Sequence, residues 1–219
     1  MKSKPRWGPA IATIVGLALY EALPPKLTFG PMWIAPVLIG LQLLPLLLLS
    51  SRIPPRVHNA MTVTLIAILN FFNIVSVVLL LNDLINPHSK HHGLTAADLL
   101  RSGALVWSMN VIVFALWFWE IDEGGAELRD DIVDPTTNTQ VDFLFPQLNL
   151  LQTHSKCVPA DWRPAFLDYL YVSFTNALAF SPTDVMPLTH IAKILMLVES
   201  LISFVTVALI LARSVNILS

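Results

Sequence analysis

Residues 173–189 read SFTNALAFSPTDVMPLT, and this stretch, with the segment that leads into it, decides how the chain is interpreted. A helix needs about 20 mostly apolar residues to cross a bilayer core of about 30 Å. The helix-forming segment 164–180 is shorter than this, and it ends at Ser181-Pro182 because proline cannot continue a helix. Its polar side chains are Asp168, Ser173, Thr175 and Asn176. Two interpretations stay open: a sixth membrane span, or a helix that enters the bilayer and turns back.

The composition places the chain in a membrane. Of its 219 residues 55% are hydrophobic and 13% are charged, and the mean hydropathy is +0.66. Soluble domains average about 25% charged residues, so a disordered chain and an ordinary water-soluble enzyme are excluded. A net charge of −2 offers no basic surface to nucleic acid. The single cysteine, Cys157, excludes an intramolecular disulfide and a thiolate zinc site. The fold class predicted is an all-α, multi-pass membrane protein.

Five other apolar segments are predicted to be transmembrane helices. They are Trp7–Leu23, Met32–Leu49, Met61–Leu81, Ala104–Ile121 and Ile191–Leu211. The first follows three basic residues, as the apolar core of a signal peptide would, but no Ala-x-Ala cleavage site follows it. We therefore interpret it as a span.

The quoted stretch resembles the pore region of tetrameric potassium channels, whose generic form is SFTTLTTVGYGDIVPVT. The residues that coincide without a gap are Ser173, Phe174, Thr175, Asp184, Pro187 and Thr189. The following AKILMLVE, which ends at Glu199, is similar to GRLLAILE at the start of that family's inner helix. The resemblance covers Phe166–Leu211, with 104–121 as an outer helix, and it does not reach the first three spans.

The resemblance implies a division of the chain into two modules. A three-span N-terminal module, 1–81, is followed by a polar connecting loop, 82–103, and then by a pore-like module, 104–219. The parts of the second module are an outer helix 104–121, an acidic loop 122–163, a pore helix 164–180, a filter-like loop 181–188 and an inner helix 189–214. The expected architecture is five transmembrane helices plus a re-entrant pore helix and loop.

The filter itself departs from the family. Potassium filters present backbone carbonyls from T-V-G-Y-G, and their glycines adopt positive φ at little cost. The matching residues here are Ala179, Phe180, Ser181, Pro182 and Thr183. Because Pro182 fixes φ near −65°, this peptide cannot copy the potassium filter, and potassium selectivity is not expected.

Side chains offer a different pore lining. In a tetramer Ser181, Thr183 and Asp184 would form hydroxyl and carboxylate rings, which favour cations. Phe180 would then be a hydrophobic constriction or a plug behind the loop. The structural alternative is that Asp184 caps the turn by bonding neighbouring amides.

Asp168–Thr175 also resembles an uncharacterised bacterial family of multi-pass membrane proteins, which shares DFLYFSFT followed by a Ser-Asp pair. That family supplies no activity. It implies that pore-like loops without the glycine filter exist as a group, with a role that need not be conduction. It also implies a location in the bacterial cytoplasmic membrane.

Other polar residues lie in or between the spans. Glu199 is an acid inside a predicted span, which marks it for function, although packing or an ion pair explains it equally well. Ser203 stands where the family has a hinge glycine. Asn70, Asn73 and Asn110 are interpreted as hydrogen-bonding neighbouring helices rather than contacting a substrate. His88, His91 and His92 are the weak candidates for metal ligands, and a solvated cluster is favoured over a metal site. No metal site or cofactor is predicted.

The distribution of basic residues opposes one of these topologies. Cytoplasmic segments of membrane proteins are rich in Lys and Arg. Six spans with a cytoplasmic N-terminus satisfy this rule. Five spans with a pore loop that opens outward leave Lys2, Lys4, Arg6 and the Arg52/Arg56 pair outside.

The function expected is that of a channel-like homotetramer in the lipid bilayer. It would pass monovalent cations with weak selectivity and have neither enzymatic activity nor nucleic-acid binding. The alternatives are a non-conducting, structural or partner-binding protein with a pore-like fold, and a six-span transporter with midplane groups Asn70, Asn73 and Glu199.

Overall fold

The computed structural model describes residues 7–31, 33–48, 54–85, 96–122, 141–152, 157–159, 162–181 and 184–218. His88, His91, His92, Pro182 and Thr183 lie outside the described residues. The helices are α1 (Trp7–Glu21), a 3-10 turn η1 (Pro25–Leu27), α2 (Ile34–Leu48), α3 (Pro55–Ile85), α4 (Ala96–Ile121), α5 (Pro146–Gln152), α6 (Phe166–Ala179) and α7 (His190–Leu218). In this part of the chain the strands are two residues long: β1 (Phe143–Leu144) and β2 (Met186–Pro187). The predicted helical class is confirmed.

Among the described residues, three helices are long and apolar enough to cross a membrane: Val57–Asp83 within α3, Ala97–Ile121 within α4 and His190–Ala212 within α7. They fit an integral membrane protein. Helices α1 and α2 have 15 residues each, which is about 22 Å at 1.5 Å per residue. Both are shorter than the spans predicted for 7–23 and 32–49.

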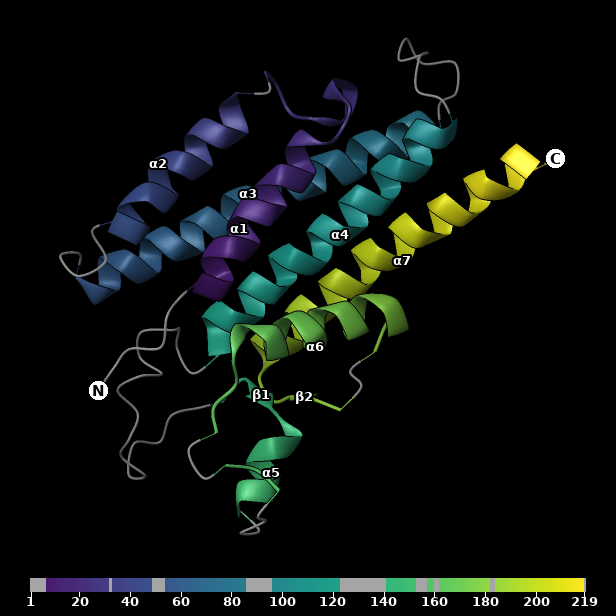
Figure 1. Ribbon diagram of the computed structural model, residues 1–219. Helices are drawn as coiled ribbons and strands as arrows, with labels where there is room; N and C mark the ends of the chain where they lie inside the picture. Colours follow the sequence, from purple (N-terminus) through teal and green to yellow (C-terminus); the bar gives the residue numbers. More distant parts are fainter. Residues whose placement is uncertain are drawn as a thin grey trace.

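The long helices alternate in direction around α4 (Figure 1). Helices α1, α3 and α7 run one way and α2 and α4 run the other way. Helix α4 contacts α1, α3, α6 and α7. The chain therefore enters α1 and α7 at the same end of the bundle at which α4 finishes, and the C-terminus lies at the opposite end (Figure 1).

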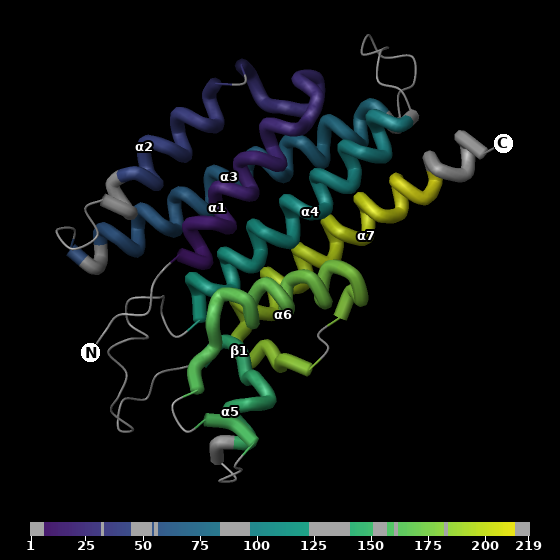
Figure 2. Tube along the Cα trace, in the orientation of Figure 1, coloured from purple at the N-terminus to yellow at the C-terminus, as the bar shows by residue number. Residues whose placement is uncertain are grey.

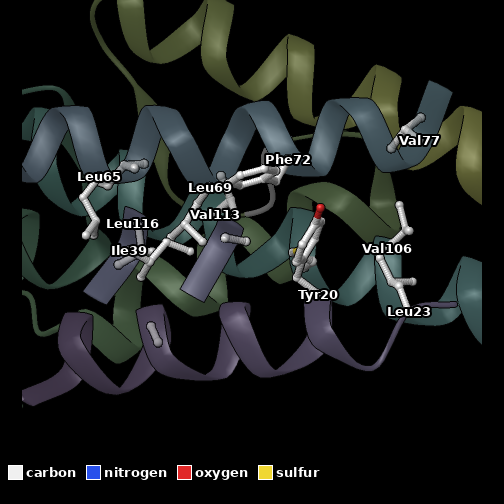
Figure 3. Packing of buried hydrophobic residues seen from close by; sticks show 14 residues of the cluster. Tyr20, Leu23, Ile39, Leu65, Leu69, Phe72, Val77, Val106, Val113 and Leu116 are labelled. Carbon is white, nitrogen blue, oxygen red and sulfur yellow. The ribbon is translucent and has the colours of Figure 1, made fainter. Parts of the chain in front are cut away.

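Helices α1 to α4 share an apolar core (Figure 3). The ring of Tyr20 on α1 packs on Phe72 of α3 with 5.0 Å between the ring centroids. Its hydroxyl accepts a hydrogen bond from the backbone N–H of Phe29 at 2.8 Å, which fixes the turn after α1. A second apolar cluster lies between the end of α4, β1, α6 and the start of α7, and includes Phe118 and Phe143.

Close helix packing explains one glycine. A Cβ built on Gly103 of α4 would lie 2.6 Å from the Cγ1 of Ile210 on α7. Small residues allow this close approach of membrane helices. The contact holds α4 against α7 near the end of the bundle away from β1 and β2 (Figure 1).

Several element boundaries differ from the prediction. Helix α3 continues to Ile85 and α4 begins at Ala96, so both ends of the predicted polar loop 82–103 are helical. The cause is local: Ala96, Ala97, Leu99 and Leu100 are strong helix formers, and Asp98 suits a helix's first turn. The predicted loop 122–163 contains β1 and α5, and the predicted loop 181–188 contains β2.

Helix α6 covers most of the predicted pore helix 164–180, and α7 begins one residue after the predicted start of the inner helix. Asp168 accepts a hydrogen bond from the backbone N–H of Ala165 at 2.6 Å, which caps the first turn of α6. At the other end the chain leaves the helix at Phe180, whose φ of 55° is left-handed.

The two ends of α6 lie at different heights along α7 (Figure 2). Near its start, Tyr169 contacts Asp122, which directly follows α4. At its end, the ring of Phe180 packs edge-on against Phe204 with 5.5 Å between centroids. Phe204 lies 14 residues after His190, which is about 21 Å along α7. Strand β2 then pairs with β1, Phe143 opposite Pro187, so the chain is back at the end of α4 when α7 begins.

Candidate functional site: two polar clusters on α6

Helix α6 is held by polar side chains at two places. Deep in the bundle lies the mid-helix cluster, defined as Asn110, Ser173, Asn176, Glu199 and Ser203. All five are buried, each with at most 1% of its surface exposed. At the end of α4, beside the paired strands β1 and β2, lies the ladder-end cluster, defined as Asp122, Asp142, Tyr169 and Thr189. This end of the helix bundle is called the ladder end below. Buried polar groups need partners, so each cluster is described by its hydrogen bonds.

Glu199 is the centre of the mid-helix cluster. Its Oε2 accepts a hydrogen bond from Nδ2 of Asn176 at 2.6 Å. Its Oε1 is in hydrogen-bond contact with the hydroxyl of Ser173. The same hydroxyl lies 2.7 Å from the backbone carbonyl oxygen of Val111 on α4. Glu199 and Ser173 thus join three helices, α4, α6 and α7, at one point.

Asn176 also forms hydrogen bonds from α6 to other groups of α7. Its Nδ2 also donates to the backbone carbonyl of Met196 at 3.0 Å, and its Oδ1 accepts from the hydroxyl of Ser200 at 3.2 Å. The carbonyl of Met196 lies in the helix, so a side chain of α6 bonds directly to the backbone of α7. This arrangement fixes the position of α6 along α7.

Asn110 extends the cluster toward α3. Its Nδ2 donates to the hydroxyl of Ser203 at 3.0 Å and lies 3.4 Å from the carbonyl oxygen of Glu199. Its Oδ1 accepts from Nδ2 of Asn73 at 3.1 Å. The predicted helix-bonding role is therefore confirmed for Asn73 and Asn110. For Asn70 no such bond is found within the part of the chain that the structure describes, and its Oδ1 lacks a partner there.

Four of the sequence-predicted site residues come together in this cluster: Ser173, Asn176, Glu199 and Ser203. Thr175 does not join them. It is partly exposed, and its hydroxyl contacts carbonyls of its own helix, Tyr171 at 2.8 Å and Val172 at 3.1 Å. Such a bond within the helix contributes nothing to the position of α6.

The filter-like residues are arranged around the end of α6. Ala179 is its last residue, and the N–H of Phe180 donates to the carbonyl of Asn176 at 2.9 Å, closing the last turn. The backbone of Phe180 is left-handed, a conformation that is uncommon for residues other than glycine. Ser181 and Asp184 are exposed, and Pro182 and Thr183 are outside the described residues.

Asp122 organises the ladder-end cluster. Its Oδ1 accepts from the backbone N–H groups of Asp142 at 2.8 Å and Phe143 at 3.2 Å, and its Oδ2 accepts from the hydroxyl of Tyr169. The hydroxyl of Thr189 donates to Asp142, whose carbonyl accepts from the N–H of Leu188 at 2.8 Å. One carboxylate therefore connects the end of α4, strand β1 and the start of α6.

Asp142 has a perturbed acidity. Burial raises its pKa above the ordinary value of 3.8, and the nearby charge of Asp122 adds to the rise, while the hydrogen bond from Thr189 opposes it. The ladder end accordingly brings two carboxyl groups close together, the buried Asp122 and the partly buried Asp142.

Sequence reasoning missed the ladder-end cluster. Its hydrogen bonds join residues far apart in the chain, such as Asp122 and Tyr169, and no short motif contains both. One signal was available: Asp122 directly follows the aromatic end of a span, where an acid is followed by no basic partner before Arg129. Such an acid indicates the end of a predicted span, but it does not identify the residues to which Asp122 is hydrogen-bonded.

Two further observations complete the description. Among the described residues no group of three His, Cys, Asp or Glu side chains is placed to hold a metal ion, and the histidine triplet predicted at 88–92 falls outside them. Comparisons with protein-family models, with curated proteins and with solved structures found no match to this chain.

Proposed function

We propose that this chain is a channel-like membrane protein in which α6 enters the bilayer beside the end of α4 and the following chain turns back to the same side. The observation that carries the proposal is the placement of the two ends of α6: Tyr169 lies at the ladder end, and Phe180 lies about 21 Å along α7. With 14 residues, α6 is also too short to cross a core of about 30 Å.

This topology requires a cover for the return segment. Non-helical backbone at membrane depth is tolerated only where protein or water shields it. In the single chain, Ala179, Phe180, Ser181 and Asp184 are exposed. In the apolar part of α7 only 22% of the helix is buried within the chain, whereas 56% of the apolar part of α4 is buried. Further copies of the chain around an axis would shield the segment on one side and leave water on the other. The number four comes from the resemblance to tetrameric channels.

The chemistry of the return segment favours cations. Ser181 and Asp184 are exposed, and copies of them around an axis would give rings of hydroxyl and carboxylate oxygens. Because the chain lacks the glycines that shape a carbonyl filter, we expect monovalent cations to pass with little discrimination. The ring of Phe180 packs on Phe204 of its own chain, which leaves it at the wall of such a pore.

The basic residues support an opening toward the cytoplasm. Eight of the 13 Lys and Arg residues lie in the sequence before α1, around the α2–α3 connection, or between α4 and α6, next to helix ends on the ladder side of the bundle: Lys2, Lys4, Arg6, Arg52, Arg56, Arg129, Lys156 and Arg163. Four lie in the sequence next to the opposite helix ends: Lys26, Lys90, Arg101 and Arg213. By the positive-inside rule the ladder end is cytoplasmic. The conflict noted for the sequence holds only for a loop that opens outward.

Cysteine labelling tests the topology. In a Cys157→Ser background, single cysteines are placed by Arg163→Cys, Asp184→Cys and Ser219→Cys, and membrane vesicles are treated with an impermeant maleimide. We expect residues 163 and 184 to label from the same face, and residue 219 from the other. If 163 and 184 label from opposite faces, α6 is a sixth span and the transporter interpretation replaces this one.

Bilayer recording of the purified protein tests conduction. We expect cation currents that Asp184→Asn reduces several-fold, because it removes the charge of the proposed ring. Asp83→Asn is the matched control, since Asp83 loses the same charge in the last turn of α3, away from the ladder end. A silent protein with intact oligomers would favour the non-conducting alternative.

A further inference from the structure

If Glu199 is ionised, the contacts around it include one more acceptor than there are hydrogens to fill them. Ser173 has one hydroxyl hydrogen. Two acceptors lie within hydrogen-bond reach of its Oγ: the carbonyl oxygen of Val111 at 2.7 Å and Oε1 of Glu199. If Glu199 were an ionised carboxylate, one of these two contacts between oxygen atoms would have no hydrogen. Both are satisfied when the carboxyl group carries a proton.

The remaining contacts agree with a neutral carboxyl group. With a proton on Oε1, Glu199 donates to Ser173, and Ser173 donates to the carbonyl of Val111. The other oxygen, Oε2, then acts as a carbonyl and accepts from Nδ2 of Asn176 at 2.6 Å. Each group keeps the partner that the structure gives it, and the donor–acceptor count is complete.

Within the part of the chain that the structure describes, Glu199 also has no charged partner to balance an ionised state. Its carboxyl group contacts Ser173 and Asn176 from α6, and its backbone carbonyl contacts Asn110 from α4. The next groups in the network are the carbonyl of Val111, bonded to Ser173, and the hydroxyls of Ser200 and Ser203, bonded to Asn176 and Asn110. None of these groups titrates or carries a charge. The nearest charged side chain on α7, Lys193, is six residues away and exposed. An unpaired charge buried in a membrane is strongly unfavourable.

We infer that Glu199 is a proton-binding site within the membrane, whose bound proton completes the hydrogen bonds that join α6 to α4 and α7. The ligand is a proton, bound at Oε1 and shared with Ser173. Loss of the proton would leave one hydrogen for two acceptors and a buried charge beside α6. The consequence for a pore, that proton loss loosens the pore helix, rests on the proposed function, whereas the proton site itself does not.

Infrared spectroscopy tests the site directly. Wild-type protein in lipid nanodiscs is compared in H₂O and D₂O at neutral pH, and we expect a C=O stretching band of a protonated carboxyl group. The band should be absent from Glu199→Gln and present in the control Asp184→Asn. A wild-type spectrum without this band, or a band that persists in Glu199→Gln, would overturn the inference. Neither result depends on whether the protein conducts.

The stability of Glu199→Gln provides a second readout. Glutamine has the shape of protonated glutamic acid, and its amide can donate to Ser173 while its carbonyl accepts from Asn176. We expect Glu199→Gln to melt close to the wild-type temperature at neutral pH, and Glu199→Asp, which is one methylene too short to make both contacts, to melt lower. If glutamine destabilises the protein as much as aspartate, the proton is not required and the inference fails.

A change at Ser173 distinguishes a site from a passive buried acid. Ser173→Ala removes the acceptor of the proposed proton and leaves Glu199 in place. The carboxyl band should then shift to the frequency of a weaker hydrogen bond. A band that is identical in Ser173→Ala and in the wild type would show that the proton is not shared with Ser173, and it would contradict the assignment.

Discussion

The two clusters that hold α6 use carboxyl groups in different ways. At the ladder end, Asp122 accepts from two backbone N–H groups and from the hydroxyl of Tyr169. In the mid-helix cluster, the hydrogen bonds described for the carboxyl group of Glu199 are to side chains, Ser173 and Asn176. Backbone donors keep their hydrogens whatever the surroundings, whereas the serine hydroxyl has a single hydrogen to share. The hydrogen bonds of the deeper cluster therefore need one additional proton, whereas those of Asp122 do not.

The comparison also shows how a short helix can be fixed beside long ones. The apolar contacts of α6 alone leave one face, with Leu167, Tyr171, Phe174 and Leu178, exposed. Hydrogen bonds in the ladder-end and mid-helix clusters add to the attachment of α6, because the hydrophobic effect gives helices little drive to associate in lipid. The polar clusters therefore add directional contacts to the apolar packing of α6.

The largest expected effect is at Asp122. Asp122→Ala removes the acceptor of two backbone N–H groups, one buried and one partly buried, and of the buried Tyr169 hydroxyl, and we expect a loss of about 3 to 5 kcal/mol in the free energy of unfolding. Circular dichroism during chemical unfolding in detergent micelles measures it.

Asp122→Asn is the control, because its remaining oxygen can still accept from both backbone N–H groups. We expect it to lose clearly less stability than Asp122→Ala. Equal losses in the two variants would mean that the charge of Asp122, and not its hydrogen bonds, holds the ladder end together.

A smaller effect is expected at Asn176. Asn176→Leu removes the donor to Glu199 and to the carbonyl of Met196, and the acceptor of Ser200. We expect a loss of about 2 to 3 kcal/mol, because membrane hydrogen bonds average less than those in water-soluble cores. The same unfolding measurement applies.

The neighbouring Thr175→Val is the matched control. The hydroxyl of Thr175 contacts carbonyls of its own helix and the residue is partly exposed, so its removal should cost clearly less stability than the loss of the buried Asn176. A Thr175 variant as destabilised as the Asn176 variant would indicate that α6 is sensitive to any change on its surface, and the special role of the mid-helix cluster would be lost.

The sequence predicted one of these clusters better than the other, for a physical reason. An acid, two amides and a serine inside apolar segments stand out because polar groups are expensive in a bilayer, so Glu199, Asn110, Asn176 and Ser173 were all found. Their mutual bonds were not, since pairing depends on how far α6 inserts along α7.

The ladder end was missed because its residues lie where polar side chains are ordinary. Asp142 and Thr189 lie outside the long apolar helices, and nothing in their spacing shows that β1 pairs with β2. The left-handed Phe180 was also unexpected, because a preference for glycine at positive φ is an average over many proteins. Here the helix end and the contact with Phe204 impose it.

The smallest effect concerns pH at the ladder end. Burial raises the pKa of Asp142 above 3.8 in the folded protein, so the folded state binds this proton more tightly than the unfolded state. The associated stability is present in full below the ordinary value and is lost as pH rises through the raised one. Asp142→Asn should remove this loss, giving an unfolding free energy that changes less between pH 3.8 and neutrality than in the wild type.

Thr189→Val sharpens the same test. It removes the hydrogen bond that lowers the pKa of Asp142, so the pKa should rise further and the loss of stability should extend to higher pH. The variant also loses the contact of Thr189 with the N–H of Ala192 at 3.2 Å, which lowers stability at every pH. The quantity to compare is therefore the pH at which the free energy of unfolding stops falling. If this pH is the same in Thr189→Val and the wild type, Asp142 is not the titrating group. Of the carboxyl groups in the two clusters, only Glu199 would then remain a candidate for proton binding.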